Sequence, residues 1–434
     1  MKFKNGMTLL LPLVGLALAQ NSGCSATNSE LTTSSSSSGT GAGGEGGSPG
    51  TGGSMGIGGI NLSGGGDGTG GGPQPCTPGP DEDFDKDGFS INEGDCDDCE
   101  PNVGPNAVEV VTEPGGDPID EDCDLEIDEE DIYIPCDSGI AIDEMSAGEA
   151  VKATDICKIS SGPKDWGLVQ ADWVLPDGSP ATNVQPGFHL GHGVLPQFGT
   201  IVQNRQGEAM LVLSSGTARQ PNDPGYQDVG GFDKGYTSAH PVGFPKESPA
   251  CPGVTTGQPH DGTGIKVVLR APQNAYGVSF DFDFYTYEWP GYVCSTYNDF
   301  FVALLTPFPQ NQTDGNISFD SMGNPVSVNN AFVDVCGCDG NPPSPCFAGG
   351  KTFTCPLGNT ELLGTGFGFD YGFEDHAATS WLQTTAPIEP SSDITLVWAT
   401  YDSGDGVLDS TTLIDNFRWI AKPGVDVGTT PVPN

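Results

Sequence analysis

The sequence predicts an all-β protein, an antiparallel β-sandwich of jelly-roll type with one helix on its N-terminal side. From residue 136 onward, short runs of β-branched and aromatic residues alternate with Gly, Pro, Asn and Asp turns, and helical periodicity is confined to residues 143–157. Residues 25–80 are mostly Gly and Ser, and residues 81–131 are rich in Asp and Glu. A disordered linker and a small acidic metal-binding module therefore precede the sandwich.

Residues 1–23 have the pattern of a secretory signal, because Lys2 and Lys4 precede an apolar stretch too short to span a bilayer. Cleavage after Ala19 would release a secreted protein. Alternatively, Ser22-Gly23-Cys24 resembles a bacterial lipobox, whose cysteine is lipidated. The chain has 13 cysteines, so lipidation of Cys24 leaves an even number for disulfides. This favours an outer-membrane or cell-surface lipoprotein, and either route exports the protein.

Residues 24–80 form the predicted linker, since a Gly/Ser composition cannot bury enough apolar surface to fold. A tether of ~55 residues spans on the order of 40 Å. It would hold the rest of the molecule clear of a membrane or cell wall.

The formal net charge is −43, with 15 Lys and Arg against 58 Asp and Glu. A nucleic-acid partner is excluded because no basic footprint is visible. The acidic residues are concentrated, with 22 of the 58 in residues 81–131. Like charges at this density indicate bound cations.

The segment "DEDFDKDGF" matches the first half of a calcium loop. Asp83, Asp85 and Asp87 stand on alternate residues before Gly88, and the carbonyl of Phe89 falls at the next ligand position. Gly94 occupies the place of the closing bidentate Glu, so the segment is not a standard EF-hand.

The continuation through "GDCDD" and "DPIDEDCDLEIDEE" makes residues 81–131 similar to the metal-binding motif of MopE-like surface proteins of myxobacterial type. That resemblance implies metal binding, with Ca²⁺ as the expected ion and its identity open, and Cys96 with Cys123 as a staple. Leu125 replaces the family's usual Gly. Cys76 and Cys99 are additional and could pair with each other, and zinc bound through Cys96 and Cys99 is the weaker alternative. The implied ligands are Asp83, Asp85, Asp87, Phe89, Asp95, Asp97, Asp98, Asp120, Asp122, Asp124, Asp128 and Glu129.

The predicted helix, "DEMSAGEAVKATDIC", places Glu144, Glu149 and Lys152 apart from an apolar stripe, and Cys136 and Cys157 are expected to clamp its ends. Within "YGVSFDFDFYTYEW", apolar and polar residues alternate, so one face of that strand should be buried and the other wet. The clearest strands are expected at residues 198–204, 208–215, 264–271, 276–289, 300–306, 393–401 and 411–420.

Two stretches, "FDFDFYTYEWPGYVCSTYNDFF" and "ATYDSGDGVLDSTTLIDNFRW", make residues 137–421 similar to the choice-of-anchor L domain. That family is bacterial and extracellular and has no generally assigned activity. The expected sandwich spans 132–421, followed by a tail at 422–434. Residues 337–355 depart from the family as a cysteine-rich insert. Pairing is left open for Cys251, Cys294, Cys336, Cys338, Cys346 and Cys355.

Carboxylates at the strand ends of this domain suggest a second metal site, because strand ends of a sandwich gather at one rim. The alternative is that Asp402, Asp405 and Asp409 make only turn hydrogen bonds. The candidate ligands are Glu288, Asn298, Asp299, Asp402, Asp409, Asp415 and Asn416.

We expect no enzyme. His189 and His192 lack zincin spacing, and the sequence has no nucleophile elbow. Asp281, Asp283 and Glu288 leave glycoside cleavage open as a minor alternative.

The sequence therefore predicts a non-catalytic, calcium-binding protein, secreted or on the cell surface, that presents a β-sandwich for adhesion or recognition. The alternatives are a metal-sequestering surface protein and a polysaccharide hydrolase. Expected partners are metal ions and glycans or surface proteins, with membrane contact only through the lipid anchor. Tyr285, Tyr287, Trp289 and Tyr292 either stack on sugars or pack the rim.

Overall fold

The computed structural model describes residues 76–112, 114–128, 135–181, 187–330, 332–337, 346–368 and 376–433. The predicted signal, Cys24, Glu129, Cys338 and nearly all of the linker lie outside these residues. In the part of the chain that is described, no helix is both long and apolar enough to cross a membrane.

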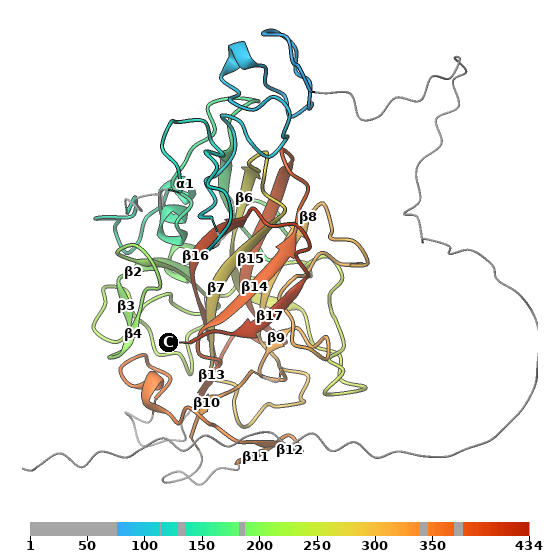
Figure 1. The fold of residues 1–434 in the computed structure, drawn as a ribbon. Helices are drawn as coiled ribbons and strands as arrows, with labels where there is room; N and C mark the ends of the chain where they lie inside the picture. The colour runs from blue at the N-terminus through green and yellow to red at the C-terminus, as the bar shows by residue number, and fades with distance from the viewer. Residues whose placement is uncertain are drawn as a thin grey trace, which may run out of the picture. The chain divides into compact units, whose positions relative to one another are not determined.

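Two antiparallel sheets form the sandwich (Figure 1). The first has the order β1-β6-β15-β8-β9, with bounds Gly167–Val174, Pro259–Arg270, Asp393–Ser403, Phe300–Thr306 and Val326–Ser327. The second is built on β14-β7-β16-β5-β2, with bounds Leu382–Pro387, Gly277–Thr286, Ser410–Ile420, Met210–Ser214 and His192–Leu195. β6-β15-β8-β9 opposite β5-β16-β7-β14 is the strand order of a jelly roll, which confirms the predicted fold class.

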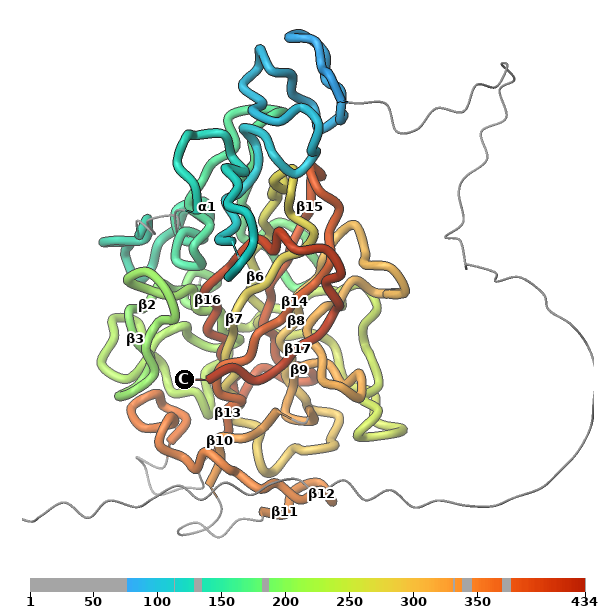
Figure 2. Tube along the Cα trace, in the orientation of Figure 1, coloured from blue at the N-terminus to red at the C-terminus, as the bar shows by residue number. Residues whose placement is uncertain are grey.

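The remaining strands are short. β10 (Val335–Cys336) and β13 (Ala377–Ala378) extend the second sheet, and β17 (Gly428–Pro431) pairs with β14. The tube in Figure 2 shows β14 and β17 side by side. The sheet thus continues beyond the predicted boundary at residue 421. Two isolated hairpins are β3–β4 (Gln197–Phe198, Val202–Gln203) and β11–β12 (Cys346–Ala348, Lys351–Phe353).

The main core lies between the sheets. Phe280, Phe282 and Phe284 of β7 are at most 1% exposed, and they share one hydrophobic cluster with Ile265 of β6 and Trp398 of β15. The rings of Phe280 and Trp398 meet edge to face at 5.2 Å. The alternation seen in the sequence therefore does select the inward-facing residues of β7.

The prediction of a wet outer face on β7 is wrong, since all ten of its residues are buried. Tyr285 packs in a second cluster with Phe198 of β3 and with Phe367, at ring distances of 5.0 and 5.6 Å. The β3–β4 hairpin and the segment after the 3₁₀ turn η5 (Thr360–Leu362) cover this face. That hairpin also replaces the single strand expected at residues 198–204, because the chain turns at Gly199 with φ of 66°.

The helix is shorter than predicted. α1 spans Ala147–Ala150 and continues as the 3₁₀ turn η2, Val151–Thr154. The Ser146 hydroxyl caps it by accepting the Glu149 N–H at 3.3 Å. It ends because Asp155 takes a left-handed φ of 70°.

The structure forms the three expected disulfide pairs and two more, all among the described residues: Cys76–Cys99, Cys96–Cys123, Cys136–Cys157, Cys251–Cys294 and Cys336–Cys355. Each closes a loop and so stabilises the fold by roughly 2–4 kcal/mol. This density of disulfides is typical of an extracellular protein.

Candidate metal centres

Three carboxylates meet where the ends of the two sheets approach each other. Glu288 follows β7, Asp299 immediately precedes β8, and Asp402 is the penultimate residue of β15. The β8–β15 register pairs Phe300 with Tyr401, which sets Asp299 beside Asp402. One carboxylate oxygen from each of the three residues lies within 4.8 Å of the other two. We call Glu288, Asn298, Asp299 and Asp402 the rim centre.

The rim centre is buried, and most of its oxygens are unpaired. All four side chains are at most 1% exposed. Glu288 Oε2 accepts the Asp299 N–H at 3.3 Å. Among the described residues, hydrogen-bond partners are absent for Glu288 Oε1, Asn298 Oδ1 and both carboxylate oxygens of Asp299 and Asp402. A buried charge without a partner costs several kcal/mol, so these oxygens require protons or a cation.

The pKa values of these carboxyl groups also indicate that the rim centre requires protons or a cation. Burial raises the pKa of Asp299 to about 7. Burial and the neighbouring Asp299 charge raise the pKa values of Glu288 and Asp402 well above their ordinary range. Three acids that suppress each other's ionisation, with only oxygen ligands, suit a hard divalent cation such as Ca²⁺.

Asp409 lies close by but outside this three-carboxylate group. It is 1% exposed and immediately precedes β16, and its N–H donates to the Val229 carbonyl at 2.8 Å. Burial raises its pKa, and the positive charge of Lys234 partly opposes that rise. A Cβ on Gly216 would come within 2.0 Å of Asp409 Oδ2, so this carboxylate needs glycine beside it.

Lys234 is a buried cation that the sequence reasoning missed. Its ammonium donates to the Ser214 carbonyl at 3.0 Å and to Thr263 Oγ1 at 3.1 Å. Burial lowers its pKa to about 8, against the charges of Asp261, Asp409 and Asp402. Nothing in its local sequence, "GFDKGY", distinguishes it from a solvated lysine.

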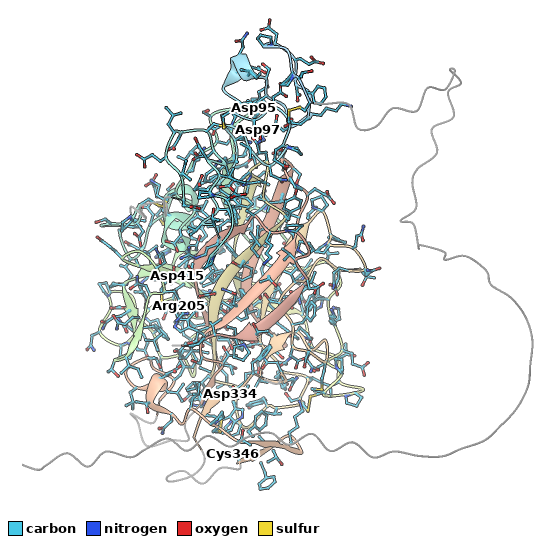
Figure 3. All side chains as sticks on the ribbon, in the orientation of Figure 1. Asp95, Asp97, Arg205, Asp334, Cys346 and Asp415 are labelled. Atoms are coloured by element: carbon cyan, nitrogen blue, oxygen red, sulfur yellow. A yellow bond between two sulfur atoms is a disulfide. The ribbon has the colours of Figure 1, made fainter. Side chains whose placement is uncertain are left out.

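The structure separates Asp415 and Asn416 from the rim centre. They lie five and six residues into β16, so at about 3.4 Å per residue Asp415 is roughly 17 Å along the strand from its start. Asp415 Oδ2 accepts the Arg205 N–H at 2.6 Å, and Asn416 Nδ2 donates to Asp281 Oδ2 at 2.9 Å. Figure 3 shows Asp415 beside Arg205. These residues hold a loop onto the sheet, so the prediction that they join the metal site is corrected.

In the acidic module, five carboxylates gather, and we call them the first acidic cluster: Asp83, Asp85, Asp87, Asp95 and Asp98. Asp85 belongs to both of its sets, one with Asp83 and Asp87 and one with Asp95 and Asp98. Asp95 and Asp98 are 3% and 2% exposed. Burial raises the pKa of Asp95 and of Asp87 to about 6.

Backbone hydrogen bonds orient this cluster. One oxygen each of Asp85, Asp95 and Asp98 accepts an N–H, from Asp87, Asp97 and Phe84 at 3.2, 2.9 and 2.6 Å. The other oxygen of each is buried and without a hydrogen-bond partner in the described chain. The turns therefore fix three carboxylates, each of which places one oxygen within 4.8 Å of an oxygen of the other two.

Two other predicted ligands of this loop, Asp97 and Phe89, do not contribute side-chain oxygens to the first acidic cluster. Asp97 is exposed and outside the cluster, and Figure 3 labels it near Asp95. The Phe89 side chain is buried, with the Lys164 ammonium 4.9 Å from its ring. A ligand role for its carbonyl stays a prediction.

The second loop brings together Glu109, Asp120 and Asp122, which we call the second acidic cluster. Glu109 was missed, because it stands outside the motif. Asp124 is exposed, and Asp128 Oδ1 accepts the Thr112 N–H at 2.6 Å, so neither joins this group.

The zinc alternative fails on chemistry. Cys96 and Cys99 belong to two different disulfides, so neither offers a thiolate. The sulfurs of Cys336, Cys346 and Cys355 also lie together, and all three are disulfide-bonded.

The aromatic residues of the rim divide into two kinds. Tyr285 and Trp289 are 0% and 1% exposed, so the structure contradicts sugar stacking on them. Tyr287 stacks on His376 at 3.4 Å. Tyr292 and Tyr297 are 37% and 39% exposed, and their rings meet edge to face at 5.8 Å.

The carboxylates considered for glycoside cleavage are engaged elsewhere. Asp281 is ion-paired with Arg205 at 3.1 Å, and Asp283 is 0% exposed and accepts the Thr379 hydroxyl at 3.2 Å. Glu288 belongs to the rim centre.

No family model and no curated protein matches the chain. Among solved structures, the chain is similar to the K2 cleaved adhesin domain of Lys-gingipain (Kgp), at 9% identity and a TM-score of 0.22. The match covers 58% of this chain and 89% of that one. A likeness this distant carries no argument about function, and the two family resemblances stay predictions.

Proposed function

We propose that the protein is a non-catalytic, calcium-binding, exported protein that presents its jelly roll for adhesion or recognition at a cell surface or in the medium. The observation that carries this proposal is the rim centre. Its three carboxylates are buried and adjacent, and five of their six oxygens lack a hydrogen-bond partner among the described residues. A divalent cation is the simplest way to offset that charge.

Calcium fits better than other common metals. The rim centre and the first acidic cluster offer carboxylate and amide oxygens, with no histidine or thiolate. Oxygen-only sites favour Ca²⁺, Mg²⁺ or Mn²⁺, and Mg²⁺ usually keeps several waters, which buried ligands leave little room for.

The cation would also order a candidate recognition loop. Residues 289–297 connect Glu288 to Asn298, so metal ligands stand at both ends of the loop. Cys294, within it, is tied to Cys251. Tyr292 and Tyr297 are its exposed aromatics, and such side chains bind sugar faces and protein surfaces. Calcium at the rim would fix the positions of these two rings.

Metal sequestration is the second candidate, and the two acidic clusters favour it. Those clusters contain half-exposed carboxylates, whereas the rim ligands are buried. Buried ligands suit a permanent structural ion, and only the acidic module suits rapid exchange.

The decisive experiment measures thermal unfolding of the mature protein in calcium and in chelator, for the wild type and for Asp402→Asn. We expect calcium to raise the Tm of the wild type, because a ligand that binds only the folded state stabilises it. Asp402→Asn should lose most of that rise. Asp426→Asn, at an exposed position that follows the far end of β16, is the matched control and should keep it.

The second arm measures binding of the same protein to a glycan panel and to cell surfaces. Calcium-dependent binding that Tyr292→Ala weakens would support recognition. Release of sugar products would instead indicate a hydrolase, and calcium uptake without any surface binding would favour sequestration.

A further inference from the structure

The acidic module is bonded to the sandwich through the loop between β6 and β7. The Gln273 N–H donates to the Asn106 carbonyl at 3.0 Å, and the Asn106 N–H donates to Gln273 Oε1 at 3.1 Å. Asn274 makes a similar pair with Val108, at 2.9 and 2.7 Å. Gln273, Asn274 and Asn106 are at most 5% exposed. These reciprocal bonds form a specific dock between two segments that are distant in sequence.

The same residues touch the candidate cation sites. Gln273 Nε2 donates to Asp87 Oδ2 at 2.5 Å, and Asp87 belongs to the first acidic cluster. Val108 directly precedes Glu109 of the second acidic cluster. The Gly104 N–H donates to the Glu121 carbonyl at 2.7 Å. This bond joins the segment that contains Gly104 and Asn106 to the loop that carries Asp120 and Asp122. The dock is thus continuous with both clusters.

The contact at Gln273 is tight. A Cβ on Gly104 would lie 2.5 Å from Gln273 Nε2 and 2.7 Å from Asp87 Oδ2. No side chain fits there without moving the amide away from the carboxylate. The position of Asp87 is therefore set jointly by its own turn and by the sandwich.

Charge links this contact to the cation. Without a cation, Asp83, Asp85 and Asp87 repel one another, and the buried oxygens of Asp95 and Asp98 have no partner in the described chain. The cluster then gains by opening, and opening moves Asp87 off Gln273. With a cation, the ionised cluster is compact and Asp87 is held where the Gln273 amide reaches it.

We propose that cation binding by the acidic module and docking of the module on the β6–β7 loop are one coupled equilibrium. The β6–β7 loop of the sandwich binds the module when the cation is present. When the cation is lost, the module is released from that loop. This inference rests on the proposed metal binding of the module. Coupling is reciprocal, so a dock that is broken by mutation must weaken the cation site by the same factor.

The test is a calcium titration of the full mature protein followed by hydrogen exchange, with chelator as the starting point. Peptides covering residues 81–100 report the module, residues 271–276 report the dock, and residues 286–300 report the rim centre. In the wild type, module and dock should gain protection at one calcium midpoint. In Gln273→Ala, the midpoint of the module should rise by about fivefold or more, the lower range of allosteric coupling, while the rim midpoint stays unchanged.

Two further variants make the outcome unambiguous. Gly104→Ala should reproduce the shift through steric displacement of the same amide, and Gln310→Ala, at an exposed glutamine on the loop after β8, should leave every midpoint in place. If residues 271–276 are equally protected in chelator and in calcium, or if Gln273→Ala does not move the module midpoint, the coupling is refuted. If residues 81–100 never respond to calcium in the wild type, the proposed metal site of the module fails first.

Discussion

The rim centre takes its carboxylates from the ends of β7, β8 and β15, whereas the first acidic cluster takes five from residues 83–98. At the rim, two hydrogen-bonded sheets hold the ligands in place, and the cation adds to a fold that already exists. In the module, turns and two disulfides hold them, with little apolar core beneath. The difference suggests that the rim ion governs global stability and that the module ion governs local order.

The largest expected effect is the dependence of folding stability on pH when a chelator keeps the protein free of calcium. Asp299 has a pKa of about 7 in the fold against an ordinary 3.8, so the folded state binds its proton more tightly. Stability should therefore be highest at low pH and fall as pH rises from about 4 through about 7, by on the order of 4 kcal/mol for this group. Urea unfolding across this range measures it.

Calcium should reverse that profile, because the metal binds the ionised carboxylates. Stability in calcium should rise with pH over the same window. A falling profile in both conditions would mean that no cation binds at the rim.

The next prediction is that Asp402→Ala changes the free energy of unfolding in one direction with calcium and in the other direction, or not at all, without it. In calcium, Asp402→Ala should lower the free energy of unfolding by about 3 kcal/mol, since it removes a ligand and leaves the site incomplete. In chelator the same change should be neutral or stabilising, because it removes one of three repelling carboxylates. Denaturant unfolding under both conditions measures it, and equal losses in both would show that Asp402 has only a packing role.

A smaller, metal-independent effect is expected at Gly216. Gly216→Ala places a methyl group 2.0 Å from Asp409 Oδ2, and relief of that clash should cost about 1–3 kcal/mol. The loss should be the same in calcium and in chelator. A loss that appears only in calcium would bring Asp409 into the metal site.

The smallest global effect is expected in the module. Asp85→Ala removes the carboxylate shared by both parts of the first acidic cluster. Limited proteolysis should then cut residues 81–128 equally fast with and without calcium, while the Tm response of the rim remains. Loss of the rim response as well would show that the two sites depend on each other.

The sequence was informative where the signal is local. Alternation identified β7, and residue spacing identified Asp83, Asp85 and Asp87, whereas Asp95 and Asp98 were expected from the resemblance to the MopE-like motif. Glu288, Asp299 and Asp402 were predicted because strand ends of a sandwich meet. Asp415 was wrongly placed with them, because its depth within β16 follows from the register, with Asp415 opposite Asp281.

Other features depend on contacts that no local pattern encodes. The outer face of β7 is buried because the hairpin at residues 197–203 covers it, far away in sequence. Lys234 is buried because Ser214 and Thr263 surround its ammonium. Glu109 joins the second acidic cluster through the fold of the loop and through no motif.

The disulfides of the acidic module have a mechanical consequence. Tension applied from the N-terminal side reaches Cys76, crosses to Cys99, and passes through Cys96 to Cys123 by the second bond. The backbone at 77–95 and 100–122 is bypassed, which withholds about 140 Å of contour length from the pulling force. Asp83, Asp85, Asp87 and Asp95 lie in the first of these unloaded loops. Of the first acidic cluster, Asp98 lies in the loaded segment 96–99. A protein held by a tether could thus be stretched without extending the two bypassed loops, which carry the other ligands of both acidic clusters.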